Sequence, residues 1–157
     1  MKKHQTLDTY EAVKEKALRL LEFRSHSERE LADKLRIKGA SDEHIELTLD
    51  FCRRYGFVND ASYAERKAND LINLKKYGIR RIRNELKMKG ISDEIIEDVL
   101  SALDTEKETE NLINLVEKRL KGDFSDKNKD KCLRYFVYRG YDIYDIKDVI
   151  LTLENGE

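Results

Sequence analysis

The feature that most constrains the fold of this chain is an internal repeat. When the 157-residue sequence is shifted by 51 positions, Ser25–Leu49 aligns with Lys76–Leu100 without a gap and with ten identities in 25 positions. A weaker third copy follows at a further shift of 50, with Gly140 at the place of Gly90. Repeats of this length are typical of supersecondary units that stack on their neighbours along the chain. The sequence therefore predicts a tandem array.

Each copy of the repeat contains the start and stop signals of helices. Ser27 and Glu30 match a capping box, Gly39 supplies a left-handed residue that ends the helix, and Ser41 caps the next one. The remaining start signals predict helices opened by Asp8 or Thr9, by Ser62 with Glu65, by Ser92 and by Thr105 with Glu108. Helices are predicted to end at Gly90 and Gly140. The polar stretch Gly122–Lys129 is predicted to be a mobile linker.

The composition supports a helical fold with a thin core. The chain has no Pro, only 7 Gly and 40% charged residues, and most of its abundant residues are strong helix formers. Strand-type alternation of apolar and polar residues is hard to find. We predict an all-α, elongated tandem array of three three-helix repeats with about nine helices, covering residues 1–58, 59–104 and 105–157.

The residues that carry chemistry do not form a recognisable catalytic or metal-binding pattern. His4, His26 and His44 are not spaced as metal ligands, and neither Cys52 nor Cys132 lies at metal spacing from them. The two cysteines are predicted to be reduced and buried. The serines are explained as helix caps, so no nucleophile stands out with a base and an orienting group. We predict no enzyme activity, no metal and no cofactor.

The location of the protein is predicted from the apolar content and the start of the chain. No apolar run approaches the roughly 20 residues of a membrane span. Met1–Gln5 is followed by acidic residues rather than by an apolar segment, which argues against a secretory signal. We therefore expect a cytoplasmic protein without a membrane interaction.

Charge is distributed unevenly, although the formal net charge is only -1. Seven basic residues lie between Lys75 and Lys89 against a single acid, and Gly90–Glu110 then holds eight acids against one base. A basic helix face suits either a polyanion or an acidic groove on another protein, and a solvated helix face is the alternative. The predicted partner- or nucleic-acid-binding residues are Lys75, Lys76, Arg80, Arg81, Arg83, Lys87 and Lys89, with Arg134 and Arg139 on the equivalent helix of the third copy.

A helix-turn-helix DNA reader is a competing interpretation of Glu30–Leu49. The recognition helix of that motif lies among phosphates and presents donors to base edges. Here the candidate helix carries Asp42, Glu43 and Glu46, which phosphates would repel. Sequence-specific DNA reading is therefore disfavoured.

Two sequence elements resemble the RecX family of bacterial regulatory proteins. The first is Tyr55–Asp60 running into Tyr63 and Ala64, and the second comprises Arg81–Arg83, Glu85 with Leu86, and Lys89–Ile91. Both elements occur in the order and at the separation that the family shows.

The resemblance implies a regulator of the RecA recombinase that binds the RecA–DNA filament and inhibits strand exchange and ATP hydrolysis. The implied partners are the RecA filament and its DNA, the chain is expected to act as a monomer, and Arg80, Arg81 and Arg83 are the implied contacts. The alternatives are a general nucleic-acid-binding helical protein and a helical scaffold for an acidic partner. The resemblance also assigns Asn59 or Asp60 to the cap of the next helix, and three aromatic residues to packing between the repeats: Tyr55, Phe57 and Tyr63.

Overall fold

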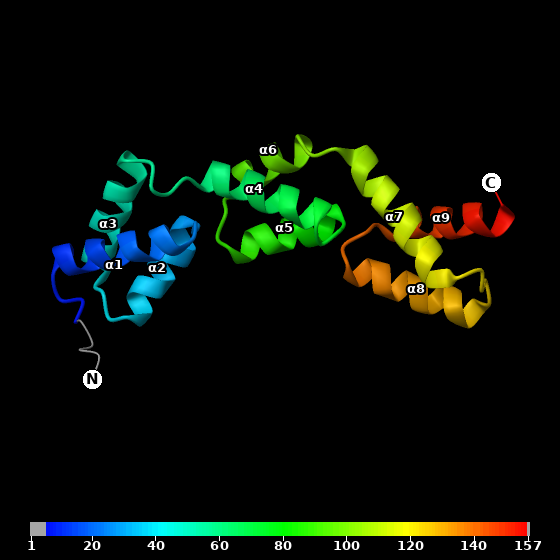
Figure 1. The fold of residues 1–157 in the computed structure, drawn as a ribbon, viewed down its shortest axis with the longest axis horizontal. Coiled ribbons are helices and arrows are strands. Elements are labelled where there is room, and N and C mark those ends of the chain that lie inside the picture. The colour runs from blue at the N-terminus through cyan, green and yellow to red at the C-terminus, as the bar shows by residue number, and fades with distance from the viewer. Residues whose placement is uncertain (1–5, 157) are drawn as a thin grey trace.

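The computed structural model describes residues 6–156, so the predictions about Met1–Gln5 and His4 lie outside the described residues. Within that range the chain is all-helical, with nine α-helices and no strand. The nine helices follow one another as three groups in a row, as the ribbon in Figure 1 shows. The helices are α1 (Tyr10–Phe23), α2 (Glu28–Ile37), α3 (Asp42–Arg54), α4 (Asp60–Asn73), α5 (Ile79–Met88), α6 (Asp93–Ser101), α7 (Thr105–Leu120), α8 (Asp126–Tyr138) and α9 (Ile143–Asn155).

Each group of three helices has its own hydrophobic core. We call α1–α3 the first unit, α4–α6 the second unit and α7–α9 the third unit. The buried core of the first unit runs from Leu7 to Val58, and that of the second from Tyr63 to Leu103. The third core runs from Leu112 to Ile150. The predicted array of three three-helix repeats is confirmed, and its elongated shape follows from three small cores placed in a row rather than one large core (Figure 1).

The predicted helix signals explain most of the helix ends. Ser41 and Ser92 each accept a backbone hydrogen bond in the first turn of the helix that follows. Gly39, Gly90 and Gly140 have φ angles of 95°, 76° and 99°, which only glycine adopts without strain. The repeat therefore shares one turn geometry across the three units.

Two capping residues predicted from local sequence signals were wrong, although α7 does begin at the predicted Thr105. The cap of α4 is not Ser62 but Asn59, one of the two residues that the family resemblance names as the cap, and its side chain accepts a hydrogen bond from the Ser62 backbone N–H at 3.1 Å. The cap of α7 is Asp104, one residue before the predicted Thr105. In both cases a carboxylate or amide oxygen outcompetes a nearby hydroxyl as the capping group.

The predicted mobile linker over Gly122–Lys129 was also wrong. Helix α8 already begins at Asp126, with Ser125 as its cap. The Asn128 amide donates hydrogen bonds to the Leu120 and Asp123 carbonyl oxygens, at 3.3 and 2.7 Å. The turn between α7 and α8 is therefore short and fixed to both helices.

Two further predictions concern the cysteines and the membrane. Cys52 and Cys132 are free and buried, as predicted. None of the helices within residues 6–156 has both the length and the apolar character that crossing a bilayer requires.

Candidate partner-binding surface

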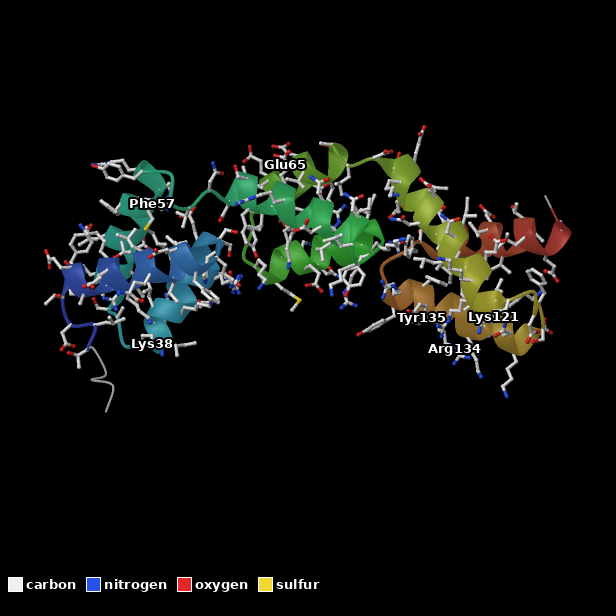
Figure 2. All side chains as sticks on the ribbon, in the orientation of Figure 1. Lys38, Phe57, Glu65, Lys121, Arg134 and Tyr135 are labelled. Carbon is white, nitrogen blue, oxygen red and sulfur yellow. The ribbon has the colours of Figure 1, made fainter. Side chains whose placement is uncertain are left out.

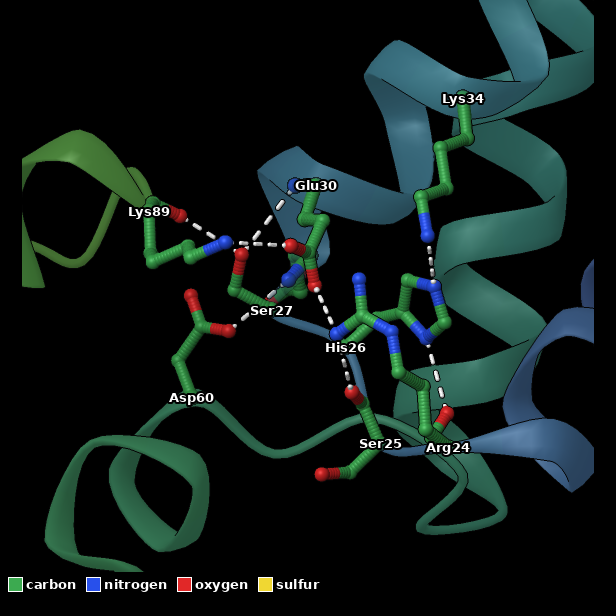
Figure 3. A network of polar contacts seen from close by, with 9 residues as sticks. Arg24, Ser25, His26, Ser27, Glu30, Lys34, Asp60 and Lys89 are labelled. Carbon is green, nitrogen blue, oxygen red and sulfur yellow. Dashed lines mark hydrogen bonds and ion pairs between the residues drawn. The ribbon is translucent and has the colours of Figure 1, made fainter. Parts of the chain in front are cut away.

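The contact between the first and second units, which we call the first junction, is built from hydrogen bonds and ion pairs (Figure 3). The Ser27 hydroxyl donates to the Lys89 carbonyl oxygen at 2.6 Å. The Lys89 ammonium in turn donates to the Glu30 carboxylate at 2.7 Å. On the other side, an Asp60 carboxylate oxygen accepts from the Glu28 backbone N–H at 2.9 Å. The start of α2 is thus held by side chains and backbone of the second unit.

Glu30 carries the charge of this junction. Burial raises the pKa of its carboxyl, but hydrogen bonds from Lys89 and from Arg24 outweigh that effect and leave the pKa lowered. The pKa of Lys89 is raised, chiefly by its hydrogen bond to Glu30. Ser27 does accept the Glu30 backbone N–H at 3.1 Å, as a capping box requires. The reciprocal half of the predicted box was wrong, because the Glu30 side chain is bonded to Lys89 and Arg24 instead.

His26 is buried beside the first junction, with only 2% of its surface exposed. Its Nδ1 lies 2.8 Å from the Arg24 carbonyl oxygen, and its Nε2 lies 2.7 Å from the Lys34 ammonium nitrogen. Burial is the largest cause that lowers the pKa of His26, and the positive charge of Lys34 lowers it further. We therefore assign a neutral ring, with Nδ1–H donating to Arg24 and Nε2 accepting from Lys34.

The contact between the second and third units, which we call the second junction, brings two backbones together. The Gly78 N–H donates to the Arg139 carbonyl oxygen at 2.9 Å, and the Arg80 N–H donates to the Gly140 carbonyl oxygen at 3.1 Å. A Cβ on Gly78 would lie within 3.0 Å of the Gly140 backbone. Only glycine therefore permits this approach.

Arginine and tyrosine side chains surround that backbone contact. The guanidinium groups of Arg81 and Arg139 lie 4.8 and 4.9 Å from the centre of the Tyr77 ring, which is cation–π geometry. Arg81 also donates to the Tyr138 carbonyl oxygen at 3.3 Å, and Arg139 donates to the Lys75 carbonyl oxygen. The two arginines thus fix the second unit to the third.

Buried polar groups of the third unit complete the second junction. Glu108 accepts the Ile79 backbone N–H at 2.6 Å, and burial raises the pKa of its carboxyl although this hydrogen bond lowers it. The Asn111 amide donates to the Ile72 carbonyl oxygen at 2.9 Å. The Tyr141 hydroxyl donates to the Lys76 carbonyl oxygen at 2.7 Å, and burial raises the pKa of that phenol. Each of these contacts satisfies a backbone group of the second unit.

The basic residues predicted to bind a partner therefore fall into two groups. Arg80 pairs with Asp142 of the third unit at 2.7 Å, although two thirds of its side chain is exposed. Arg83 pairs with Glu97 inside the second unit. Lys87 is exposed and forms no ion pair with any residue that the structure describes. The residues whose side chains bond to another unit are Arg80, Arg81, Lys89 and Arg139. Those whose side chains form no hydrogen bond or ion pair to another unit within residues 6–156 are Lys75, Lys76, Arg83, Lys87 and Arg134.

The aromatic residues assigned to packing between the repeats are placed differently from one another. Tyr63 is buried in the core of the second unit. Tyr55 and Phe57 both contact Phe51 of the first unit, with ring centres 4.7 and 6.2 Å away. They are 62% and 50% exposed, so the prediction that they pack between units is corrected. The aromatic residues that do contact another unit include Tyr77, Tyr138 and Tyr141, all at the second junction.

Sequence reasoning missed a basic groove in the third unit, between the end of α7 and α8. It has a volume of about 430 Å³. Its lining includes no carboxylate. We call it the α7–α8 groove. A signal was available in the sequence, since three of the four residues 118–121 are basic. The cations and aromatic rings that line it are Lys118, Arg119, Lys121, Lys131, Tyr135 and Phe136.

Metal chemistry has no assembled set of ligands in this part of the chain. Among residues 6–156, no group of three or more His, Cys, Asp and Glu side chains is placed to hold a metal ion. What the surface does offer is the cationic α7–α8 groove and exposed aromatic rings on a long array. The fold defines a helical-repeat protein, a class in which small units stack in a row and create an extended surface.

Comparison with known proteins identifies the family. The model of the first three-helix domain of RecX matches residues 14–52, and the model of the second three-helix domain matches residues 59–100. The chain is 34% identical to Regulatory protein RecX of Clostridium botulinum (strain Eklund 17B / Type B), over 92% of this chain and 69% of that protein. It is 36% identical to Regulatory protein RecX of Clostridium perfringens (strain 13 / Type A), over 96% of this chain and 72% of that protein. The chain belongs to the RecX family.

Solved structures support the same assignment. The crystal structure of RecX from Lactobacillus salivarius superimposes with a TM-score of 0.81 and 25% sequence identity. The superposition covers 94% of this chain and 97% of that one. The arrangement of the three units is therefore shared with that RecX structure, and the chain is similar to regulatory proteins.

Proposed function

We propose that this protein regulates a RecA recombinase in the cytoplasm by binding the RecA–DNA filament and inhibiting its ATPase and strand-exchange activities. Membership of the RecX family over more than nine tenths of the chain is the observation that carries this proposal. The protein acts as a monomer and stoichiometrically, by occupying sites on the filament, and it has no catalytic activity of its own.

The geometry of the array supports binding to a filament. Three units in a row offer a long surface, which can contact more than one subunit of a helical partner (Figure 1). The two junctions hold the units in fixed positions, so less conformational entropy is lost on binding than with loosely tethered units. Shape and preorganisation therefore suit a repetitive target.

The structure changes which basic residues should be tested. Reversing Arg80 would place a second carboxylate beside Asp142, so its effect on inhibition could come from the second junction. Lys87 is the cleaner choice, since it is exposed on α5 and free of ion pairs within residues 6–156. The matched control is Lys38, which is also exposed and lies at the end of α2 in the first unit.

The direct test measures ATP hydrolysis and strand exchange by RecA of the same organism, with this protein at substoichiometric amounts. We expect the wild-type protein to inhibit both activities, and Lys87→Glu to weaken inhibition by about tenfold, a loss of the size of one charge-assisted contact. Lys38→Glu should inhibit as the wild type does. No inhibition by the wild-type protein at any ratio would contradict the proposal.

A further inference from the structure

We propose that the α7–α8 groove is a binding site for single-stranded nucleic acid, with lysines that contact phosphates and a stacked arginine–tyrosine pair that contacts a base. This deepens the proposed function by naming the component of the filament that this groove would contact, and to that extent rests on it. The groove lies in the third unit and borders the second junction, since the Arg139 guanidinium lies 5.7 Å from the centre of the Tyr135 ring that lines the groove.

The cations of the groove are free to bind an anion. Lys118, Lys121 and Lys131 are exposed and form no ion pair within the described part of the chain. Elsewhere in the third unit, Lys129 pairs with Glu154 at 3.2 Å. Asp130 lines the groove between α8 and α9, on the other side of α8. The positive charge on the α7–α8 side is therefore left without a neutralising carboxylate.

The charge is also separated along the molecule. The groove between α4 and α6 of the second unit is lined by Glu65 and Asp98, and no cation lines it. In Figure 2, Glu65 lies on the upper edge of the second unit, whereas Lys121 and Arg134 lie on the lower edge of the third unit. A polyanion would be attracted to the third unit and repelled from the α4–α6 groove.

An aromatic platform distinguishes this groove from a simple basic patch. The Arg119 guanidinium lies 3.7 Å from the centre of the Tyr135 ring, and that ring meets Phe136 edge-on at 4.9 Å. Both Arg119 and Tyr135 are exposed. Unstacked bases bind on guanidinium planes and aromatic rings, which are available in single strands and not in a duplex. The combination of lysines with this pair favours a single strand over an acidic protein.

The backbone at Lys121 provides an independent observation. Lys121 has a φ of 51°, and Gly122 follows with a φ of 76°. A non-glycine residue is disfavoured in this left-handed conformation, and a lysine nevertheless occupies it. The Asn128 amide holds this turn by bonding to Leu120 and Asp123. The backbone at Lys121 is thus held in a disfavoured conformation at a residue that lines the groove.

The test measures fluorescence anisotropy of a labelled oligothymidylate of about 20 nucleotides, which exceeds the site of one small binding module, with the full chain and no RecA. Lys118→Gln with Lys131→Gln should weaken binding about tenfold at ~0.15 M salt and lower the log–log salt slope by about 1.4, or 0.7 per phosphate. The control is Lys38→Gln with Lys147→Gln, two exposed lysines outside the groove. It should stay within twofold of the wild type. Equal losses in both double variants, or no loss in the first, would overturn the proposal.

Two more measurements separate the base contact and the class of partner. Tyr135→Ala should weaken oligothymidylate binding several-fold, whereas Tyr135→Phe, which keeps the ring, should bind as the wild type does. A duplex that binds as tightly as the single strand would overturn the stacking contact. Polyglutamate that competes as well as unlabelled oligothymidylate would show an acidic protein surface to be the partner, which also overturns the proposal.

The proposal and the proposed function fail separately. If the wild-type protein inhibits RecA while the groove variants bind oligothymidylate normally, the groove assignment is wrong and the regulatory function stands. If the groove variants lose oligothymidylate binding but the wild-type protein leaves RecA unaffected, the groove assignment stands and the regulatory function is wrong.

Discussion

The two junctions use the same positions of the repeat with different chemistry. Ser27 of the first junction aligns with Gly78 of the second, and Glu30 aligns with Arg81. In the first junction, a carboxylate from one unit meets an ammonium from the next at 2.7 Å. In the second, the equivalent positions are both arginines, which cannot pair with one another, and both lie over Tyr77. The repeat thus conserves where the units touch, while each contact is specified by its own side chains.

This difference predicts that the two junctions respond differently to salt and pH. The first junction depends on interactions between charged groups. Added salt screens these interactions, and a change of pH that alters the protonation of a group removes them. The second junction also contains an ion pair, between the largely exposed Arg80 and Asp142. It depends more on the close backbone hydrogen bonds at Gly78 and on the two guanidinium groups over Tyr77, which require the units to stay in close contact. We therefore expect the second and third units to behave as one body under conditions that loosen the first unit.

The largest expected effect is that of Gly78→Ser, which places the residue of the first junction into the second. The new Cβ would lie within 3.0 Å of the Gly140 backbone, so the two units must move apart. We expect a loss of about 2–3 kcal/mol in the free energy of unfolding, the upper part of the range for forced overpacking, because the clash is with backbone atoms. Urea unfolding followed by circular dichroism measures this loss. The reference is Ser27→Ala, which removes a hydroxyl at the same repeat position and should cost about 1 kcal/mol; a larger loss for Ser27→Ala would reverse the comparison.

The next effect concerns the ion pair of the first junction. Glu30 and Lys89 are 12% and 32% exposed, so their charge-assisted hydrogen bond is only partly screened. A double-mutant cycle with Glu30→Gln and Lys89→Met should give a coupling free energy of about 1 kcal/mol. The matched cycle with Arg83→Gln and Glu97→Gln tests a more exposed pair within one unit and should give about half as much or less. Equal coupling in the two cycles would show that the first junction is not held by this pair.

A smaller effect is expected from the pH dependence of the first junction. The pKa of His26 in the folded protein is below its ordinary value of 6.5. The unfolded chain therefore binds protons more readily, so stability is fully present above pH 6.5 and declines as the pH falls through that value toward the folded pKa. Lys34→Met removes the neighbouring positive charge but not the burial, so it should flatten the decline without abolishing it. Thermal unfolding between neutral and mildly acidic pH measures both, and parallel curves would remove Lys34 from the explanation.

The smallest effect is expected outside both junctions, at Lys121. Lys121→Gly removes the steric cost of a lysine in the left-handed conformation, but glycine also makes the unfolded chain more flexible. We expect a net gain of about 0.5–1 kcal/mol in the free energy of unfolding. The same change should weaken oligothymidylate binding. Because the residue is remote from both junctions, it should raise the stability of the third unit without changing the contacts between units. A destabilised Lys121→Gly variant would contradict the described backbone.

The sequence predicted the fold closely because the signals are local. Gly39, Gly90 and Gly140 end helices through their own backbone preference, and Ser41 and Ser92 cap helices through their own side chains. The wrong start of α8 has a local cause as well, since Ser125 was an available cap within the polar stretch that was taken for a mobile linker.

The roles of the basic residues could not be predicted in the same way, because they depend on neighbouring units. A cluster of arginines has the same appearance in sequence whether its partner is another protein or the next repeat. Arg80 meets Asp142 and Lys89 meets Glu30, across 62 and 59 residues of sequence. Tyr55 and Phe57 were assigned between units, yet they lie on Phe51 nearby in the chain. Aligning the copies identifies the contact positions only once one junction is known.

The most direct test asks whether arginines of the basic segment hold the second and third units together. Spin labels at Ser101→Cys and Lys147→Cys, with Cys52 and Cys132 replaced by Ala, place one probe on each of these units. Double electron–electron resonance should give a single narrow distance distribution, and Arg81→Gln with Arg139→Gln should broaden it while leaving the helical content unchanged. A distribution that is already broad in the parent protein, or that stays narrow without the two arginines, would contradict their role at the second junction.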